Sequence, residues 1–556
     1  MTMTLTIATF ILFTALVALA TWWTTRGGNR EVTDEGYFLA GRSLSGVFIA
    51  GSLLLTNLST EQLIGLNGRA FVEGLSVMAW EVIAGMSLVA LALYFLPRYL
   101  RSGIATVPQF FEERYGASVR AVTTLVFVVA YMLILLPFVL FAGAKGLSGM
   151  LGLEELLGLN ELQTIWVVVV FIALVGSAYA IWGGLKAVAV SDTFNGAGLL
   201  IGGLMLTYFA LAAVAGEGGS VLSAFSIIAD HDPDAFQSLG TMEEDVSWPT
   251  LFTGVLLLNF FYWSTNQQII QRTFAAKNLA EGQKGVLLAA FFKILAPLIL
   301  VVPGIAAAYL AATDDGFAEK VSGGDAAYGA LVATVLPKPL VGFFAAVVVG
   351  SILSTFNSVL NSSATLFSLD VYKNFLRRNA STKEVVRSGQ LCSLIVAVFA
   401  VIAAPTVFYQ REGIFDFFQK LNGVYFIPVL AIMIVGLVNR TADGLSALIT
   451  LIVGLGAMSL GTFLSGEREA LNADGAAEKV PGWVNDVFGS GFHFMGAVFA
   501  SLIVLQFALD KIGLRRAEPY QQADSGAVDM TPWRPAPLVG AGLVVLALSV
   551  YAAFAF

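Results

Sequence analysis

The chain has 556 residues, of which 57% are hydrophobic and only 12% are charged. An average soluble domain has about 25% charged residues, so this composition excludes a soluble globular protein. One cysteine, Cys392, and two histidines, His231 and His493, exclude a disulfide framework and argue against a histidine-rich metal or haem site. The net charge of −8 is less informative than the positions of the charges.

Apolar runs of about 20 residues recur along the whole chain, and each can cross about 30 Å of hydrocarbon as a helix. Because the runs are continuous rather than alternating, they favour helices over barrel strands. We therefore predict an all-α polytopic membrane protein with about 14 transmembrane helices. The first run is interpreted as a retained helix rather than a signal peptide, since no Lys or Arg precedes it. The predicted spans are 4–24, 44–67, 73–97, 121–144, 162–182, 190–214, 248–269, 285–311, 339–368, 388–406, 414–437, 442–464, 489–509 and 536–555.

The basic residues are distributed unevenly between the predicted loops. With the N-terminus outside, the loops assigned to the cytoplasm contain 21 of the 30 Lys and Arg residues, and the outer loops contain seven. The outer segment from Glu217 to Asp245 contains none. By the positive-inside rule, we expect a multi-pass plasma (inner) membrane protein with both termini extracellular or periplasmic.

Two of the predicted spans are interrupted by dense polar clusters, at residues 56–62 and 259–267. Four further spans follow each interrupted span, so the chain divides into two five-helix units of opposite orientation. LeuT-type inverted repeats of this kind place a substrate site at the bilayer midplane, beside their broken first helices. Polar residues that only hold helices together are the alternative, but they explain scattered single residues better than two clusters at matched positions. The expected units are 1–43 (an extra helix and a cytoplasmic loop), 44–247 (the first repeat and an outer loop), 248–440 (the second repeat) and 441–556 (three accessory helices).

Glu81 and Lys293 place charges inside two different predicted spans. A charge at bilayer depth costs several kcal/mol even on lenient insertion scales, so it is retained only beside a partner, a cavity or a substrate. Together with the polar clusters, these charges predict a path for a polar solute; a purely structural ion pair is the alternative. A membrane enzyme would need a Cys or His nucleophile or base in a span, and Cys392 has no His partner in its run. We therefore predict a transporter and no enzymatic activity.

Six motifs occur in order along the chain: DEGYFLAGR at 34–42, NLSTEQLIG at 57–65, TVPQFFEERY at 106–115, YAIWGGLKAV at 179–188, YWSTNQQIIQR at 262–272 and LNSSATLFSLDVYK at 360–373. Together they resemble the sodium/solute symporter family, specifically its sodium/glucose cotransporter branch. The resemblance runs in register from about residue 30 to 440 and more loosely beyond. It implies a secondary active symporter that takes up a hexose with Na⁺ by alternating access.

The resemblance also implies where Na⁺ binds. Na⁺ requires five or six oxygens, which neutral hydroxyls and the carbonyls of an unwound helix can provide. Hydroxyls that bond back to their own helix are the alternative. The implied main site comprises Leu55, Leu58, Ser351, Ser354 and Thr355. A possible second Na⁺ site comprises Asp192, Asn357 and Ser358; alternatively, Asp192 only attracts cations at the cytoplasmic mouth.

The implied solute site needs amide, carboxylate and ammonium partners, because each sugar hydroxyl both donates and accepts. The expected substrate-binding residues are Gln62, Glu81, Asn259, Lys293, Tyr262, Trp263 and Asn422. The expected gate residues are Leu66, Trp80 and Phe418 on the outer side and Tyr262 on the cytoplasmic side. Two departures from the family pattern shorten or remove contacts: Asn422 replaces a Gln, and Ala84 replaces a Ser.

A glucose- or galactose-like sugar is the leading solute, and the alternatives are inositol, a sialic acid or an amino acid. An anionic solute would need an Arg or a bare helix N-terminus at the midplane, and Glu81 argues against that. The expected partners are the sugar, Na⁺ and the lipid bilayer. No nucleotide-binding loop is found, and nucleic acid is not expected as a partner.

Overall fold

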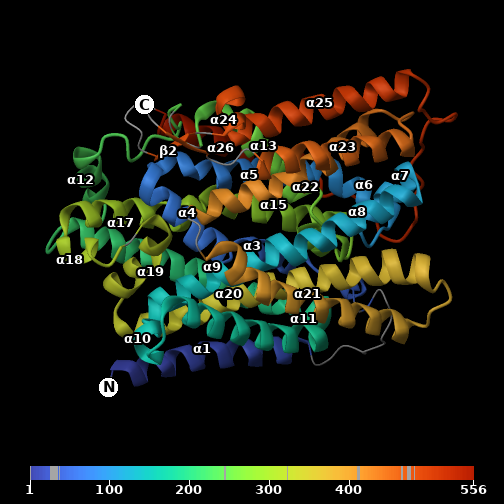
Figure 1. Cartoon of the computed structure of the whole chain (residues 1–556). Helices are drawn as coiled ribbons and strands as arrows, with labels where there is room; N and C mark the ends of the chain where they lie inside the picture. Colours follow the sequence, from blue (N-terminus) through green and yellow to red (C-terminus); the bar gives the residue numbers. More distant parts are fainter. Residues whose placement is uncertain are drawn as a thin grey trace.

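The computed structural model describes residues 2–25, 36, 38–242, 244, 246–321, 323–409, 413–464, 468–471, 477–480 and 482–555, although the side chains at 2–4, 25, 178–184, 468–471 and 477–480 lie outside that description. Residues 34, 35 and 37 of the first motif also lie outside it. The described chain is an elongated helical bundle in which most long helices run along one common direction (Figure 1). One short antiparallel hairpin accompanies the helices, formed by β1 (Arg468–Leu471) and β2 (Ala477–Val480).

The helices and short helical turns follow one another along the chain with few long connections. In order, they are α1 (Thr2–Thr25), η1 (Ala40–Arg42), α3 (Gly46–Asn57), α4 (Thr60–Glu73), η2 (Gly74–Met78), α5 (Ala79–Ala90), η3 (Leu91–Phe95), α6 (Leu96–Ser102), α7 (Val107–Tyr115), α8 (Ala117–Ala130), η4 (Tyr131–Leu135), α9 (Leu136–Leu151), α10 (Leu153–Leu157), α11 (Glu161–Ala215), α12 (Ser223–His231), η5 (Trp248–Phe252), α13 (Gly254–Ser264), α14 (Gln267–Phe274), α15 (Leu279–Leu295), α16 (Pro297–Leu300), α17 (Val302–Thr313), α18 (Asp315–Ala318), α19 (Gly324–Val335), α20 (Lys338–Thr365), η6 (Leu366–Leu376), α21 (Thr382–Phe408), α22 (Ile414–Val438), α23 (Gly444–Phe463), α24 (Trp483–Phe488), α25 (Gly491–Lys511) and α26 (Ala536–Ala553).

Among the described residues, ten helices are long and apolar enough to cross a membrane, judged by length and composition. An eleventh is obtained if α15 and the α16–α17 segment, bent by 46°, form one span. The predicted count of 14 is therefore not confirmed. The difference arises at three places: the continuous stretch Thr60–Ser102 covers parts of two predicted spans, Glu161–Ser177 is short, and the span predicted at 248–269 is divided between α13 and α14.

The long helix α11 cannot be straight, because two of its glycines contact the same neighbour at points that are close together. Gly176 lies against Phe356 and Gly202 against Phe344, both in α20. At 1.5 Å per residue, the two glycines would be about 39 Å apart in a straight helix, whereas the two phenylalanines are separated by about 18 Å of helix. The helix is therefore bent between the two glycines.

Two helices are broken inside the bundle, within the polar clusters noted in the sequence. The first break separates α3 from α4 at Leu58 and Ser59, and the Ser59 hydroxyl caps the new helix by accepting from the Glu61 backbone N–H. The second break separates α13 from α14 at Thr265 and Asn266. Each break leaves backbone groups without an intrahelical partner, so these groups are free to bind neighbouring side chains or ions.

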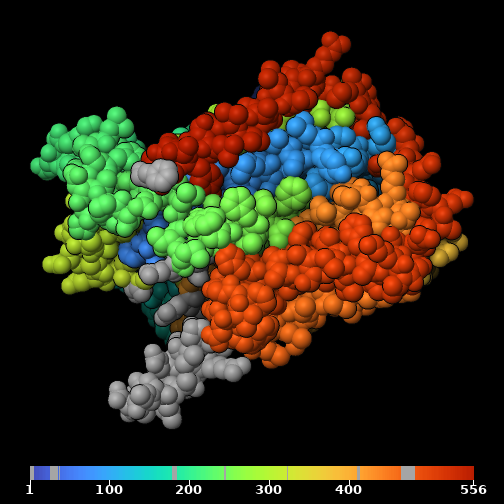
Figure 2. Space-filling view, turned by 90° about the horizontal axis from the view of Figure 1, so that it is seen from above, coloured from blue at the N-terminus to red at the C-terminus, as the bar shows by residue number. Residues whose placement is uncertain are grey.

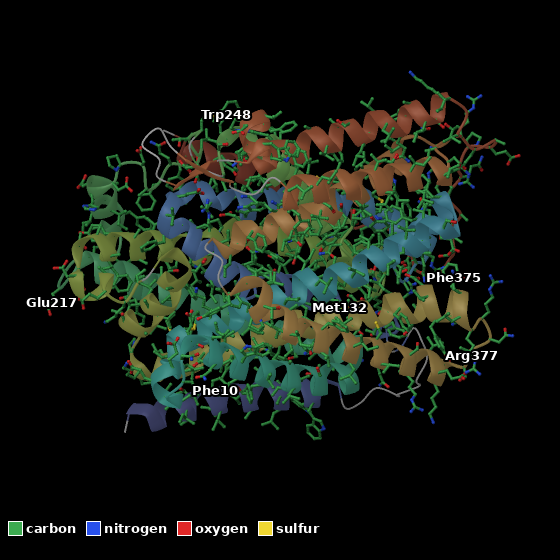
Figure 3. The ribbon with its side chains drawn as sticks, viewed as in Figure 1. Phe10, Met132, Glu217, Trp248, Phe375 and Arg377 are labelled. Atoms are coloured by element: carbon green, nitrogen blue, oxygen red, sulfur yellow. The ribbon has the colours of Figure 1, made fainter. Side chains whose placement is uncertain are left out.

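The two ends of the bundle differ in the segments they expose. Glu217 lies at one end and Phe375 and Arg377 lie at the other (Figure 3). Helix α1 begins and α26 ends at the Glu217 end (Figure 1). The first helix thus starts and the last helix finishes at the same end of the bundle.

The sides of the bundle are largely apolar. Large side chains such as Leu16, Leu19, Leu391 and Val398 are about half exposed on α1 and α21, which suits contact with hydrocarbon rather than water. Helices from distant parts of the sequence pack together: α26 lies against α5, and α25 against α13 and α22. Figure 2 shows the resulting face, where an early segment in blue is flanked by late segments in red.

Candidate functional site

A narrow cavity lies between the two broken helices and the helices α5, α15 and α22. Its lining is mostly polar, although it lies deep in an apolar bundle. The lining residues are Asn57, Glu61, Gln62, Trp80, Glu81, Leu258, Asn259, Tyr262, Trp263, Lys293, Phe418, Gln419, Asn422 and Phe426. All seven residues predicted to bind solute are in this set, so the structure brings them together.

The two charges predicted inside spans meet at this cavity. The Lys293 ammonium in α15 donates hydrogen bonds to the Glu81 carboxylate in α5 and, at 2.5 Å, to the Asn57 side-chain oxygen. Both charged side chains are 1% exposed. The ammonium also lies 5.5 Å from the centre of the Trp263 ring. From the sequence, a structural ion pair and a solute-binding role were alternatives for Glu81 and Lys293. In the structure, the two residues form an ion pair and also line the cavity.

Three polar atoms at the cavity are buried and have no hydrogen-bond partner among the described residues. They are the acceptors Glu61 Oε2 and Gln62 Oε1 and the donor Trp80 Nε1. Buried polar groups are nearly always paired, so orphaned groups around a cavity point to a ligand or water that completes them. Glu61 is the second acidic side chain in the lining after Glu81, and Lys293 is the one ammonium beside these two acidic side chains.

The amide side chains show where the sequence prediction was incomplete. Asn259 donates to the Val255 carbonyl of its own helix at 3.1 Å. Asn422 donates to Gln419 at 3.1 Å. Gln419 precedes Asn422 by three residues on α22, so it faces the same cavity and offers the longer amide that position 422 lacks. Neither Gln419 nor Asn57 was predicted to bind solute; the i, i+3 spacing in α22 was the available signal for Gln419.

Aromatic rings cover the cavity. Trp80 packs edge-to-face on Phe415, with the ring centres 5.5 Å apart. Phe418 stacks on Phe138 at 4.0 Å. Of the residues predicted to act as gates, Trp80, Phe418 and Tyr262 line the cavity. Leu66 does not: it is fully buried in α4 and is absent from the cavity lining.

A cluster of oxygens lies where α3 ends against α20. The Ser351 hydroxyl donates to the Leu58 carbonyl at 2.9 Å, and the Thr355 hydroxyl donates to the Thr56 carbonyl at 2.8 Å. The Ser354 hydroxyl is buried and lies beside the Asp192 carboxylate. Leu55 belongs to the last turn of α3, whose carbonyls lie beyond the regular helical ladder. The five residues of the expected main Na⁺ site therefore share one junction between two helices.

The residues of the expected second site lie beside this junction, with a residue that the prediction omitted. Asp192 accepts a hydrogen bond from Ser52 at 2.6 Å. The Asn357 side-chain oxygen is buried without a partner. Ser358 accepts a hydrogen bond from the guanidinium of Arg272, which is fully buried. Arg272 ends the fifth sequence motif, and its burial was not foreseen.

Two broken helices around a polar cavity, with an oxygen cluster at one break, define a secondary transporter. The profile of the sodium:solute symporter family matches residues 37–454, and the chain belongs to this family. It is therefore a transporter and not an enzyme, and Na⁺ is its coupling ion.

Known proteins similar to the chain include characterised and uncharacterised symporters. "Uncharacterized symporter YidK" of Escherichia coli (strain K12) is 39% identical over 553 residues, which cover 99% of this chain and 91% of that protein. The sodium/glucose cotransporter of Vibrio parahaemolyticus is 30% identical over 467 residues, covering 81% and 83%. The solved structure of a substrate-bound, outward-open Na⁺-coupled sialic acid symporter shares the fold, with a TM-score of 0.75, 17% identity and coverage of 93% and 99%.

Proposed function

We propose that this protein imports a neutral monosaccharide of the glucose or galactose type together with Na⁺, by alternating access. The observation that supports this most is the combination of orphaned acceptors, an orphaned donor and a buried ammonium around one cavity. A hexose has a ring of hydroxyls that both donate and accept, so it can complete all of these groups at once. The similarity to a sodium/glucose cotransporter points to the same class of solute.

The charges of the cavity favour a neutral solute over an anionic one. Glu61 and Glu81 contribute two carboxylates, and Lys293 is the single ammonium in the lining. A solute carboxylate would therefore share one ammonium with two acidic side chains at bilayer depth, where charge is costly. A sialic acid is disfavoured on this ground, whereas inositol remains compatible as a second neutral polyol.

In this proposal, the main Na⁺ site comprises Leu55, Leu58, Ser351, Ser354 and Thr355. An ion bound there would link the broken helix α3–α4 to α20, and so favour the conformation in which the adjoining cavity is complete. Such coupling is reciprocal, because each ligand must raise the affinity of the other by the same factor. The proposed orientation places both termini outside, so that the Arg377 end faces the cytoplasm.

Uptake by proteoliposomes containing the purified protein tests the proposal. Labelled glucose, galactose, myo-inositol, proline and sialic acid are presented with an inward Na⁺ gradient or with choline in its place. We expect Na⁺-dependent uptake of a hexose, and no uptake by Lys293→Ala vesicles prepared in parallel. Na⁺-dependent uptake confined to proline or sialic acid would contradict the hexose assignment.

A further inference from the structure

Arg272 is a guanidinium held entirely inside the bundle. It lies in α14, the second half of the second broken helix, and it is 0% exposed. Its donors contact the Ser52 hydroxyl at 3.2 Å, the Ser358 hydroxyl and the Gln268 carbonyl. It thereby joins α14 to both α3 and α20. A buried cation of this kind requires a compensating negative charge as well as hydrogen-bond acceptors.

Asp192 provides that charge, through one intervening hydroxyl. The Asp192 carboxylate is 1% exposed and accepts from Ser52 at 2.6 Å. Ser52 thus accepts from the Arg272 guanidinium and donates to the Asp192 carboxylate. The two buried charges form an indirect pair between α14 and α11.

The same group of oxygens is the one from which a second Na⁺ site was expected. Ser358 is engaged by the guanidinium directly, and Asp192 is engaged through Ser52. A second Na⁺ at this position would have to share a single carboxylate with a fixed positive charge. We propose that the Arg272 guanidinium takes the place of a second coupling cation beside Asp192, so that the transporter binds one Na⁺ and gains a second site only when this charge is removed.

One unpartnered oxygen shows that the surroundings could hold an ion once the guanidinium is gone. The Asn357 amide oxygen is buried without a hydrogen-bond partner among the described residues. With the two oxygens of the Asp192 carboxylate and the Ser358 hydroxyl, it makes four oxygens of the kind that Na⁺ binds. Loss of the guanidinium would also leave Asp192 as an uncompensated buried charge, which favours recruitment of a cation.

The Arg272 guanidinium lies close to the proposed main Na⁺ site, and the present inference rests on that proposed site. The Thr56 carbonyl accepts from Thr355, and the Thr56 hydroxyl is 3.2 Å from the Ser358 hydroxyl. One residue of α3 therefore contacts both positions. The guanidinium and the coupling ion would both hold α3 against α20. The guanidinium is a permanent part of the chain, whereas the ion can exchange.

Counting bound ²²Na⁺ on purified protein in detergent, without any solute, tests the inference. We expect one ion per wild-type protein, two per Arg272→Gln protein and one per Arg272→Gln/Asp192→Asn protein. Arg272→Lys keeps the charge and should bind one ion, whereas a purely structural role for Arg272 would not change the ion count in any of these variants.

Two bound ions in the wild type, or one in monodisperse Arg272→Gln protein, would overturn the inference. If Arg272→Gln does not fold, the wild-type and Arg272→Lys counts decide, because two ions on either contradict it. The assay uses Na⁺ alone, so it is unaffected if the solute is not a hexose. A wild-type count of zero would instead contradict the proposed main Na⁺ site.

Discussion

Lys293 and Glu81 form a buried ion pair across the contact between α15 and α5, and both side chains are 1% exposed. Neither can reach an aqueous interface, so each stabilises the charged form of the other at a depth where a lone charge would be costly. The pair also forms part of the cavity wall, and Asn57 takes a further hydrogen bond from Lys293. The Lys293–Glu81 contact thus joins α15 to α5 and also forms part of the cavity wall.

We expect Lys293→Ala to weaken hexose binding severely while Na⁺ binding remains measurable. Loss of a charged hydrogen bond typically costs about 1.5–3 kcal/mol, which corresponds to roughly tenfold to more than a hundredfold in affinity. Equilibrium binding of labelled hexose measures the loss. The double variant Glu81→Gln/Lys293→Met separates the two roles of the ammonium: near wild-type affinity in this variant would mean that Lys293 only neutralises Glu81.

Glu61 should be a direct acceptor for the solute, because its Oε2 atom is buried at the cavity without a partner. Glu61→Gln retains the shape but replaces an acceptor oxygen by an NH₂ donor. We expect hexose affinity to fall by about tenfold or more, the usual effect of losing a hydrogen bond to a charged group. ²²Na⁺ binding without solute serves as the control and should stay at the wild-type level. Unchanged hexose affinity would remove Glu61 from the site.

Thr355→Val should raise the Na⁺ concentration that gives half-maximal uptake, because it removes a hydroxyl while keeping the side-chain volume. The Thr355 hydroxyl reaches the Thr56 carbonyl across the helix junction. A matched control is Ser363→Ala on the same helix, since the Ser363 hydroxyl bonds only to the Val359 carbonyl one turn away. An equal shift in both variants would indicate a general effect on α20 rather than loss of an ion ligand.

Gln419→Leu should weaken hexose binding about as much as Asn422→Leu, because the two amides are hydrogen-bonded to each other on the cavity side of α22. The double variant should then lose less than the sum of the two single losses, since the residues are directly coupled. Lys420→Ala is the neighbouring control, as Lys420 does not line this cavity. A normal hexose affinity in Gln419→Leu would leave Asn422 as the only amide contact from α22.

Gly68→Val should lower the thermal stability of the purified protein, because the backbones of α4 and α19 touch at this residue. A Cβ atom at Gly68 would lie 2.7 Å from the Gly324 carbonyl oxygen, and backbone cannot move aside as a side chain can. Overpacking of this kind typically costs about 1–3 kcal/mol. Gly456→Val adds the same side chain where nothing lies within 4 Å, and its melting temperature should stay close to that of the wild type.

Much of this arrangement could be predicted from the sequence because the bilayer makes polar residues conspicuous. The clusters at 56–62 and 259–267 contain the observed helix breaks, and all seven predicted solute residues line one cavity. Gln419 and Arg272 were missed for a different reason: their roles depend on which neighbouring helix they face. That information lies in packing between distant segments, and one sequence does not contain it.

Other sequence-based expectations remain predictions. In α11, the segment Leu185–Ala215 is long enough to count as a span, whereas Glu161–Ser177 is too short, so only one of the two predicted spans is counted there. The unit boundaries near residues 44, 248 and 441 and the orientation of the termini stay predictions.

The most direct test of the account is to measure whether Na⁺ and hexose bind cooperatively to the purified protein. Hexose affinity is determined at zero and saturating Na⁺, and Na⁺ affinity at zero and saturating hexose. The account predicts that each ligand raises the affinity for the other by the same factor, and that Thr355→Val reduces this factor. Hexose affinity that is the same with Na⁺ and with choline would contradict it.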